Sequence, residues 1–213
     1  MKSGNWQLSR DKYMSLDEVK RLRRSAEDRA LADLAKGRTS GVRSWAVIDL
    51  ALSTGLRVSE ISDVRVGDLT FSGSEPHLIV RDGKGGKPRT VMLPEELKRH
   101  LRDFISWKRR IGEPELAEDY LFVTERGTKF TTRALQLLFK RAVKKAGLPS
   151  HFSIHACRHS YGTYLYQKTK DLRLVQDQLG HSSPAVTQVY SHITPEDRVK
   201  SVNGLWIDQV SKE

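Results

Sequence analysis

Apolar residues recur at helical spacing along most of the chain, in segments that polar, glycine-containing stretches separate. Ser15 and Glu18 have the spacing of a capping box, and Met14 with Val19 has that of a hydrophobic staple, so a helix is predicted to begin there. Gly55 closes a second apolar pattern, as a glycine after a helix commonly does. The pattern predicts helices over 13–34, 43–55, 56–69, 95–110, 132–147, 153–167, 171–180 and 184–193.

The middle of the chain changes to the alternation that is typical of strands. Two such runs, His77–Arg81 and Arg89–Leu93, flank a glycine-rich turn and predict a hairpin. The run "YLFVT" at 120–124 predicts one more short strand, and Pro94 stands where helices commonly begin. The predicted fold class is mainly α (α+β), a helical domain with a small antiparallel β-sheet at its side.

Length and charge narrow the functions that this fold can serve. The 213 residues suffice for one large domain or two small ones, and Lys plus Arg outnumber Asp plus Glu by 37 to 26. The net charge of +11 favours nucleic acid as the partner, ahead of an anionic membrane surface. No apolar run reaches the length of a spanning helix, no signal-peptide pattern follows the basic start, and the single cysteine, Cys157, fits a reducing compartment. We expect a cytoplasmic, DNA-associated protein with no membrane partner.

Several basic residues stand in patterns that suit anion binding, although each pattern is weak by itself. Arg57 and Glu60 are three residues apart, which is typical of a surface ion pair but also suits an arginine aimed at a phosphate. His155 and Arg158 have the same spacing and suit two adjacent donors to one anion. His155 and His159 have the spacing of a helical metal pair, but the glutamate that a zincin needs after the first histidine is absent, so no metal is predicted.

Two other segments carry candidate residues. The turn "GKGGKP" lacks the order of a Walker A motif, and its Lys84 and Lys87 suit either a solvated turn or a hairpin tip that enters a DNA groove. Arg89, at the start of the second strand, is another candidate for DNA contact. His181 follows a predicted helix end, and Tyr190 lies on the next predicted helix, where a tyrosine taken alone is usually a packing residue.

Taken together and in this order, these residues resemble the signature of the tyrosine recombinase (phage integrase) family. The matching segments are "TGLRVSEI", "GKGGKPRTVMLP", "HACRHSYGTYL" and "LGHSSPAVTQVYSH", and the resemblance runs from about Tyr13 to His192. It implies a catalytic domain over 13–194 and a tail at 195–213 that docks on a neighbouring protomer. The polar residues 1–12 are expected to form a loose segment.

The resemblance also implies a role for each position. Tyr190 would attack a DNA phosphodiester as the nucleophile and form a 3′-phosphotyrosyl link. Lys84 would protonate the departing 5′-oxygen, and Arg57 and Arg158 would hold the non-bridging oxygens. The general chemistry agrees, because preorganised cations stabilise the charge that builds on the phosphate, and the arginine fork stays charged in any site.

His155 and His181 would complete the pocket, and Glu60 would orient it from behind. A covalent ester keeps the bond energy of the phosphodiester, so strand rejoining is expected to need no metal, ATP or other cofactor. The implied function is site-specific recombination of a double-stranded DNA site, carried out by a homo-oligomer, a tetramer on DNA, as in enzymes of mobile elements.

Three alternative functions are compatible with some of the same residues. A type IB topoisomerase nicks and reseals one strand with similar groups, and a non-catalytic DNA-binding module would keep the fold but lose one member of the set. A metal-dependent nuclease is disfavoured because few Asp and Glu residues lie near the histidines. The residues before "STGLR" already belong to the first predicted helices, so we expect no separate N-terminal core-binding domain, in either a minimal recombinase or a fragment of one.

Overall fold

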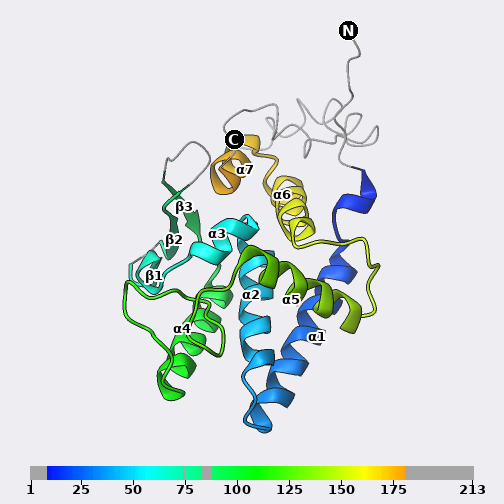
Figure 1. Cartoon of the computed structure of the whole chain (residues 1–213). Helices are drawn as coiled ribbons and strands as arrows, with labels where there is room; N and C mark the ends of the chain where they lie inside the picture. Colours follow the sequence, from blue (N-terminus) through cyan, green and yellow to red (C-terminus); the bar gives the residue numbers. More distant parts are fainter. Residues whose placement is uncertain (1–8, 74, 83–87, 181–213) are drawn as a thin grey trace, which may run out of the picture.

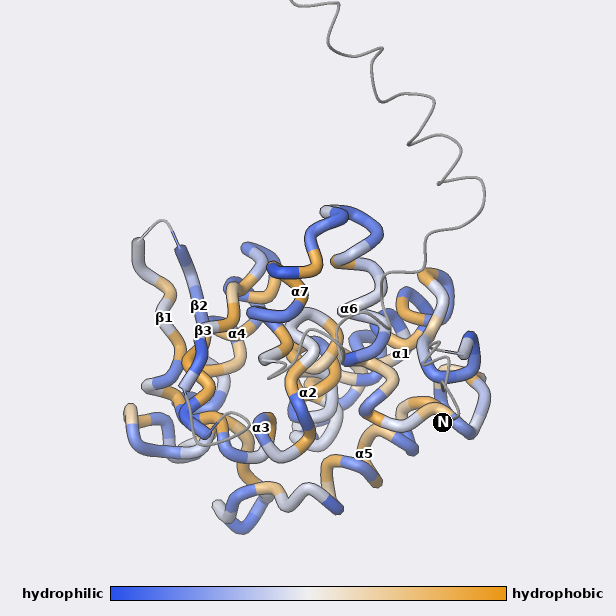
Figure 2. The backbone as a smooth tube through the Cα atoms, turned by 90° about the horizontal axis from the view of Figure 1, so that it is seen from above, coloured by the Kyte–Doolittle hydropathy of each residue, from blue (hydrophilic) through white to orange (hydrophobic). Residues whose placement is uncertain are grey.

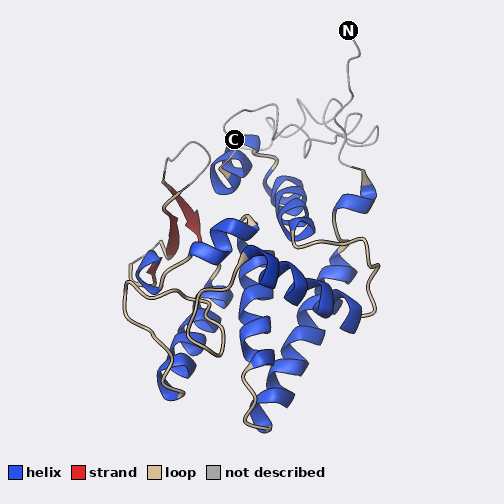
Figure 3. Ribbon diagram, viewed as in Figure 1, coloured by secondary structure: helices blue, strands red, loops and turns tan. Residues whose placement is uncertain are grey.

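The computed structural model of the protein describes residues 9–73, 75–82 and 88–180. Helices dominate this part of the chain, and the strands lie together at one side (Figure 1, Figure 3). The α-helices are α1 Leu16–Ala35, α2 Ser40–Thr54, α3 Val58–Asp63, α4 Glu95–Arg110, α5 Thr132–Lys145, α6 His155–Thr169 and α7 Leu172–Leu179. The strands are β1 Leu69–Thr70, β2 His77–Val80 and β3 Arg89–Met92, and two 3-10 turns are η1 Arg10–Lys12 and η2 Val66–Asp68. The predicted mainly α fold class is confirmed.

The first long helix begins where its capping box predicts. The Ser15 hydroxyl accepts a hydrogen bond from the Glu18 backbone N–H at 3.1 Å, and the Glu18 carboxylate accepts one from the Ser15 N–H at 2.7 Å. The preceding Met14 is fully buried, and its N–H donates to the Ser160 hydroxyl at 2.9 Å. The start of α1 is therefore fixed both by its own cap and by α6.

Helix α2 is the centre of the core. It is apolar along most of its length, and Val47, Ile48 and Leu50 on it are inaccessible to solvent. Helices α1, α4, α5 and α6 pack around it, and Figure 2 shows α2 near the middle of the view from above, with the other helices about it. Burial of large aliphatic side chains on several faces makes α2 the centre of the core, and α3, which carries Glu60, follows it directly in the chain.

The strands form one antiparallel sheet in the order β1-β2-β3. Leu78 of β2 lies opposite Val91 of β3, and both side chains are fully buried, so this pair fixes the register against the helical core. The predicted hairpin is thereby confirmed to within one residue at the end of each strand. Strand β1 is an addition that the sequence pattern did not predict.

Two predicted elements are wrong. The helix expected over 56–69 stops at the end of α3, because the Asp68 carboxylate accepts a hydrogen bond from the Arg65 N–H at 2.8 Å and fixes a turn there. The segment at 120–124 is not a strand; it meets its neighbours only in isolated bridges, such as that of Tyr120 with Arg65. Its apolar residues are buried by helices and turns rather than paired in the sheet.

Candidate active site

A buried carboxylate, Glu60 in the first turn of α3, organises the site. Arg57 is the residue before α3 and has an extended backbone, so the pair does not share a helical face as the spacing predicted. Instead, the Glu60 carboxylate accepts the Arg57 backbone N–H at 2.8 Å and the Arg57 Nη1 at 2.7 Å. The arginine is thus held at the helix start by both its main chain and its side chain.

Arg89, the first residue of β3, holds the same carboxylate from the other side. Its Nη1 donates to Glu60 Oε1 at 2.8 Å and its Nη2 to Glu60 Oε2 at 2.9 Å, which is a two-pronged contact. Burial by itself raises the pKa of Glu60, but the hydrogen bonds and charge of Arg89, with the bonds from Arg57, outweigh it and lower the pKa to about 2. Glu60 is therefore ionised throughout the physiological range.

Arg158 on α6 is buried and ties three elements together. Its Nη1 donates to the Gly55 carbonyl at 2.9 Å and its Nη2 to the Leu179 carbonyl at 2.6 Å. Gly55 adopts the left-handed conformation, with φ of 63°, at the end of α2. A Cβ atom there would lie 2.8 Å from side-chain atoms of both Leu179 and Tyr161, so only glycine allows α2, α6 and α7 to approach this closely.

Three arginines converge on the C-terminal end of α7. Besides the Arg158 contact, Arg57 Nη2 donates to the Gly180 carbonyl at 3.3 Å, and Arg89 Nε donates to the Gln178 carbonyl at 3.3 Å. The last carbonyls of a helix carry a partial negative charge, so cations are favoured at this end. The arrangement concentrates positive charge directly before position 181 in the chain.

Two histidines lie near this cluster. His155 is the first residue of α6; it is exposed, but partial desolvation of its ring and the positive charges of Arg158 and Arg57 lower its pKa from the ordinary 6.5. His159 lies one turn later, with ring centroids 5.3 Å apart, and burial together with the charges of His155, Arg158 and Lys12 lowers its pKa to about 4. Both rings are therefore neutral at pH 7.

The structure thus brings together Arg57, Glu60, Arg89, His155 and Arg158 from the set that the sequence singles out. The other members of that set lie outside the described residues: Lys84, Lys87, His181 and Tyr190. Within the described ranges, no three His, Cys, Asp or Glu side chains form a group that could hold a metal ion. In those same ranges no helix has the length and hydropathy that crossing a bilayer demands.

Comparison with known proteins identifies the family. The family model described as "Phage integrase family" matches residues 12–197. This chain belongs to the phage integrase family. It is 36% identical over 186 residues to the tyrosine recombinase XerD of Oceanobacillus iheyensis, an alignment that covers 85% of this chain and 57% of the relative. It is 34% identical over 154 residues to the tyrosine recombinase XerC of Actinobacillus pleuropneumoniae serotype 7, covering 72% of this chain and 48% of the relative.

Solved structures agree with the family assignment. The crystal structure of the XerH site-specific recombinase bound to a difH substrate matches 94% of this chain and 55% of that chain, with 26% identity and a TM-score of 0.74. The fold of this phage integrase chain is therefore that of a tyrosine recombinase catalytic domain. The chain spans about half the length of the curated relatives that it matches.

Sequence reasoning missed two features of this phage integrase site. The sequence indicates DNA contact for Arg89, whereas the structure pairs it with the glutamate that also holds Arg57. Gln178 is also buried, and its Oε1 accepts the Met92 N–H at 3.1 Å, which ties α7 to β3. An arginine at the start of a strand is only a weak signal for such an ion pair, because the fold decides which distant residues meet.

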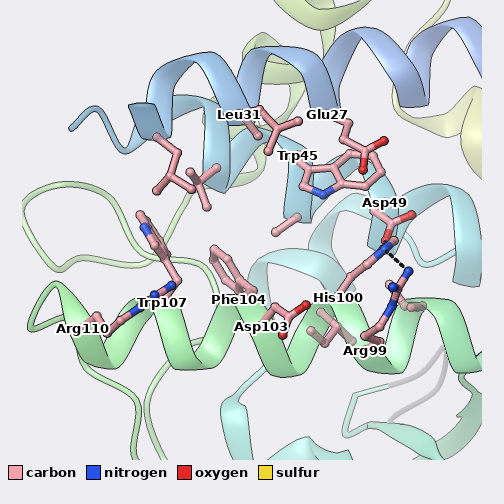
Figure 4. A pocket seen from close by; sticks show the side chains of 16 residues that line it. Glu27, Leu31, Trp45, Asp49, Arg99, His100, Asp103, Phe104, Trp107 and Arg110 are labelled. Carbon is pink, nitrogen blue, oxygen red and sulfur yellow. Dashed lines mark hydrogen bonds and ion pairs between the residues drawn. The ribbon is translucent and has the colours of Figure 1, made fainter. Parts of the chain in front are cut away.

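A separate groove of about 400 Å³ lies between α1, α2 and α4. Figure 4 shows Trp45, Phe104 and Trp107 along it, with Asp49 beside His100. The Asp49 carboxylate is 2.8 Å from His100 Nδ1 and also pairs with Arg23 at 3.0 Å, so this buried acid has its partners inside the fold. We assign no part of the family chemistry to this groove.

Proposed function

We propose that this chain cleaves and rejoins DNA strands at specific sites through a covalent tyrosyl intermediate. The Tyr190 oxygen attacks the phosphorus, the bond from phosphorus to the 5′-oxygen breaks, and a 3′-phosphotyrosyl ester forms. Lys84 supplies the proton to the departing 5′-oxygen. Attack of that 5′-hydroxyl, or of one from a second duplex, on the ester reverses the step and releases the tyrosine.

The observation that carries the proposal is the convergence of Arg57 and Arg158 at the end of α7, with His155 close enough to feel the charge of both. Arg57 precedes α3 and Arg158 lies on α6, yet both donate to carbonyls of the last residues before His181. Two guanidinium groups can donate to the two non-bridging oxygens of one phosphate, where negative charge grows in the transition state. Loss of one such donor typically slows an enzyme by roughly 10² to 10³-fold.

The histidine adds a proton acceptor. Its lowered pKa keeps His155 neutral at pH 7, so its ring can accept the proton that the phenol must lose. An ordinary tyrosine has a pKa near 10 and is a weak nucleophile, so removal of its proton beside two cations is needed for attack at neutral pH. The same positive charge favours the phenolate.

The relatives support this assignment. The curated relatives are named tyrosine recombinases, and the solved XerH recombinase is bound to a difH substrate. We also propose that this chain acts on a double-stranded recombination site, as a tetramer, in the cytoplasm. The catalytic domain over 13–194 and a tail at 195–213 that docks on a neighbouring protomer are part of the proposal. The names of the relatives do not favour the topoisomerase or non-catalytic alternatives.

A selection for covalent adducts tests the chemistry even though the target site is not specified beforehand. The full chain is incubated with a pool of nicked duplexes of randomised sequence in EDTA, and DNA that migrates with protein on a denaturing gel is amplified and sequenced. We expect enrichment of a defined site, with a protein–DNA adduct that Tyr190→Phe abolishes while DNA binding persists. A wild-type protein that binds DNA but never forms the adduct would contradict the proposal.

The selected site then separates recombination from strand relaxation. Two labelled duplexes that carry the site are mixed with the protein, and exchanged products are measured. Recombination predicts products that join the two duplexes. Relaxation of supercoiled plasmid, with no joined products, would indicate the topoisomerase alternative instead.

A further inference from the structure

Among the described residues, two arginines donate four hydrogen bonds to the Glu60 carboxylate. Arg89 contributes one bond to each carboxylate oxygen, whereas the Arg57 side chain contributes a single bond, through Nη1 to Oε1. The fourth bond comes from the Arg57 backbone N–H. A carboxylate has about four acceptor positions, so this one is saturated.

We propose that Arg89 is a positioning residue that occupies Glu60 with its two-pronged contact and so leaves the Arg57 guanidinium available to a DNA phosphate. This inference rests on the proposed function, because it concerns the same arginine. The family resemblance implies no such role for Arg89, and the sequence indicates DNA contact alone.

Charge explains why the second arginine matters. Arg57, Arg89 and Glu60 together carry one net positive charge. Without Arg89, the buried Glu60 carboxylate would keep one cationic partner among the described residues, and the Arg57 fork would turn to satisfy both Glu60 oxygens. The pair would then be neutral, and the phosphate would have to compete with Glu60 for the Arg57 donors.

Arg89 also supports the segment that leads to the nucleophile. Its Nε donates to the Gln178 carbonyl at 3.3 Å, and a Cβ atom on Gly180 would lie only 2.6 Å from its Cδ. Its side chain is thus enclosed between α3 and the end of α7, with only 11% of it exposed. Both terminal nitrogens of the Arg89 guanidinium are bonded to Glu60, which favours a positioning role for Arg89 over direct contact with a DNA phosphate.

The experiment compares substitutions at Arg89 and Glu60 on a nicked duplex carrying the site recovered by the randomised-pool selection. Three quantities are measured for each protein: the rate of covalent adduct formation, the DNA dissociation constant as a function of salt, and the thermal midpoint. The matched control is Arg109→Met, because Arg109 also makes a two-pronged contact with a glutamate, Glu115, but at the far end of α4. We expect the control to match the wild type in all three.

For Arg89→Met we expect adduct formation to fall about 100-fold, in line with the loss of one transition-state donor, while the DNA dissociation constant changes less than about threefold. The double variant Arg89→Met with Glu60→Gln should recover about tenfold of that loss, because no carboxylate then competes for Arg57. A purely structural role for Arg89 would not give this recovery, since the second substitution removes still more contacts. Arg89→Lys keeps the charge but loses the two-pronged contact, so its rate of adduct formation should lie between those of the wild type and Arg89→Met.

Each contrary result has its own meaning. Arg89→Met that forms adduct at the wild-type rate would overturn the inference, and so would a double variant that recovers nothing. A larger DNA dissociation constant for Arg89→Met, with a dependence of log affinity on log salt that is less steep by about 0.9, would identify Arg89 as a phosphate contact and would also overturn the inference. If Arg89→Met fails to fold, Arg89→Lys and its double variant with Glu60→Gln are compared in the same way. A wild-type protein without any adduct would instead refute the proposed function.

Discussion

Gly55 provides a test of how tightly the site is packed against the core. Gly55→Ala puts a methyl group 2.8 Å from Leu179 Cδ2 and from Tyr161 Cδ1, in a position where φ is +63°. The left-handed backbone alone costs a non-glycine residue about 1–2 kcal/mol. Overpacking of a filled core adds roughly 1–3 kcal/mol, because Leu179 is fully buried and cannot swing aside.

The matched control is Gly147→Ala. Gly147 has the same φ of +63° after α5, but a Cβ atom there meets nothing within 4 Å, so only the backbone cost applies. We expect Gly55→Ala to unfold at lower urea, with a free energy of unfolding about 1–3 kcal/mol below that of Gly147→Ala. For a chain of this size the difference is roughly 2–12 °C in thermal midpoint.

The result also bears on the arginine cluster. The Gly55 carbonyl accepts from Arg158, and Leu179 supplies the other carbonyl that holds this arginine. Displacing α7 from α2 therefore disturbs both contacts, and adduct formation should fall in Gly55→Ala more than in Gly147→Ala. Equal free energies of unfolding for the two variants, within about 0.5 kcal/mol, would refute the close packing on which this reasoning depends.

Two further predictions concern buried charge. The pKa of His159 in the folded protein, about 4, lies below its ordinary 6.5, so its contribution to stability is complete above pH 6.5 and is lost as the pH falls toward 4, by no more than about 3 kcal/mol. The pKa of Glu60 is also lowered, so its contribution to stability is lost in the same direction but at lower pH, from 4.5 toward 2. Urea unfolding of the wild type and of His159→Gln is measured across both pH ranges, and between pH 6.5 and 4 the free energy of unfolding should change less with pH in the variant. Identical slopes for the two proteins would contradict this. Glu113→Gln should lower the free energy of unfolding by about 3–5 kcal/mol, because it leaves the fully buried Lys108 ammonium without its carboxylate, whereas Glu115→Gln at an exposed pair should leave the urea midpoint unchanged.

Local signals predicted much of the fold. The capping box at Ser15 and Glu18 depends only on residues within one turn, and the hairpin depends on two alternating runs beside a glycine-rich turn. Such signals act over a few residues, so the sequence carries them directly. The prediction for the segment at 120–124 was wrong because it also used only local signals. Its apolar residues have the local pattern of a strand, but the fold buries them without a partner strand.

The site was only partly predictable, because its contacts join distant segments. The family signature singles out Arg57 and Arg158, but nothing near either residue indicates that both donate to carbonyls at the end of α7. The pairing of Arg89 with Glu60 spans 29 positions and depends on how β3 lies against α3. Such contacts follow from the packing of the whole core, which a local pattern does not encode.

The partners of the arginines explain why this core matters to the chemistry. Arg57, Arg89 and Arg158 each donate to a main-chain carbonyl at the end of α7, and Arg158 donates to that of Gly55 as well. Carbonyl positions are set by the path of the backbone rather than by the identity of a side chain. The geometry of the cluster is therefore governed by residues that let the backbones approach, and Gly55 determines the placement of the guanidinium groups as directly as the arginines themselves do.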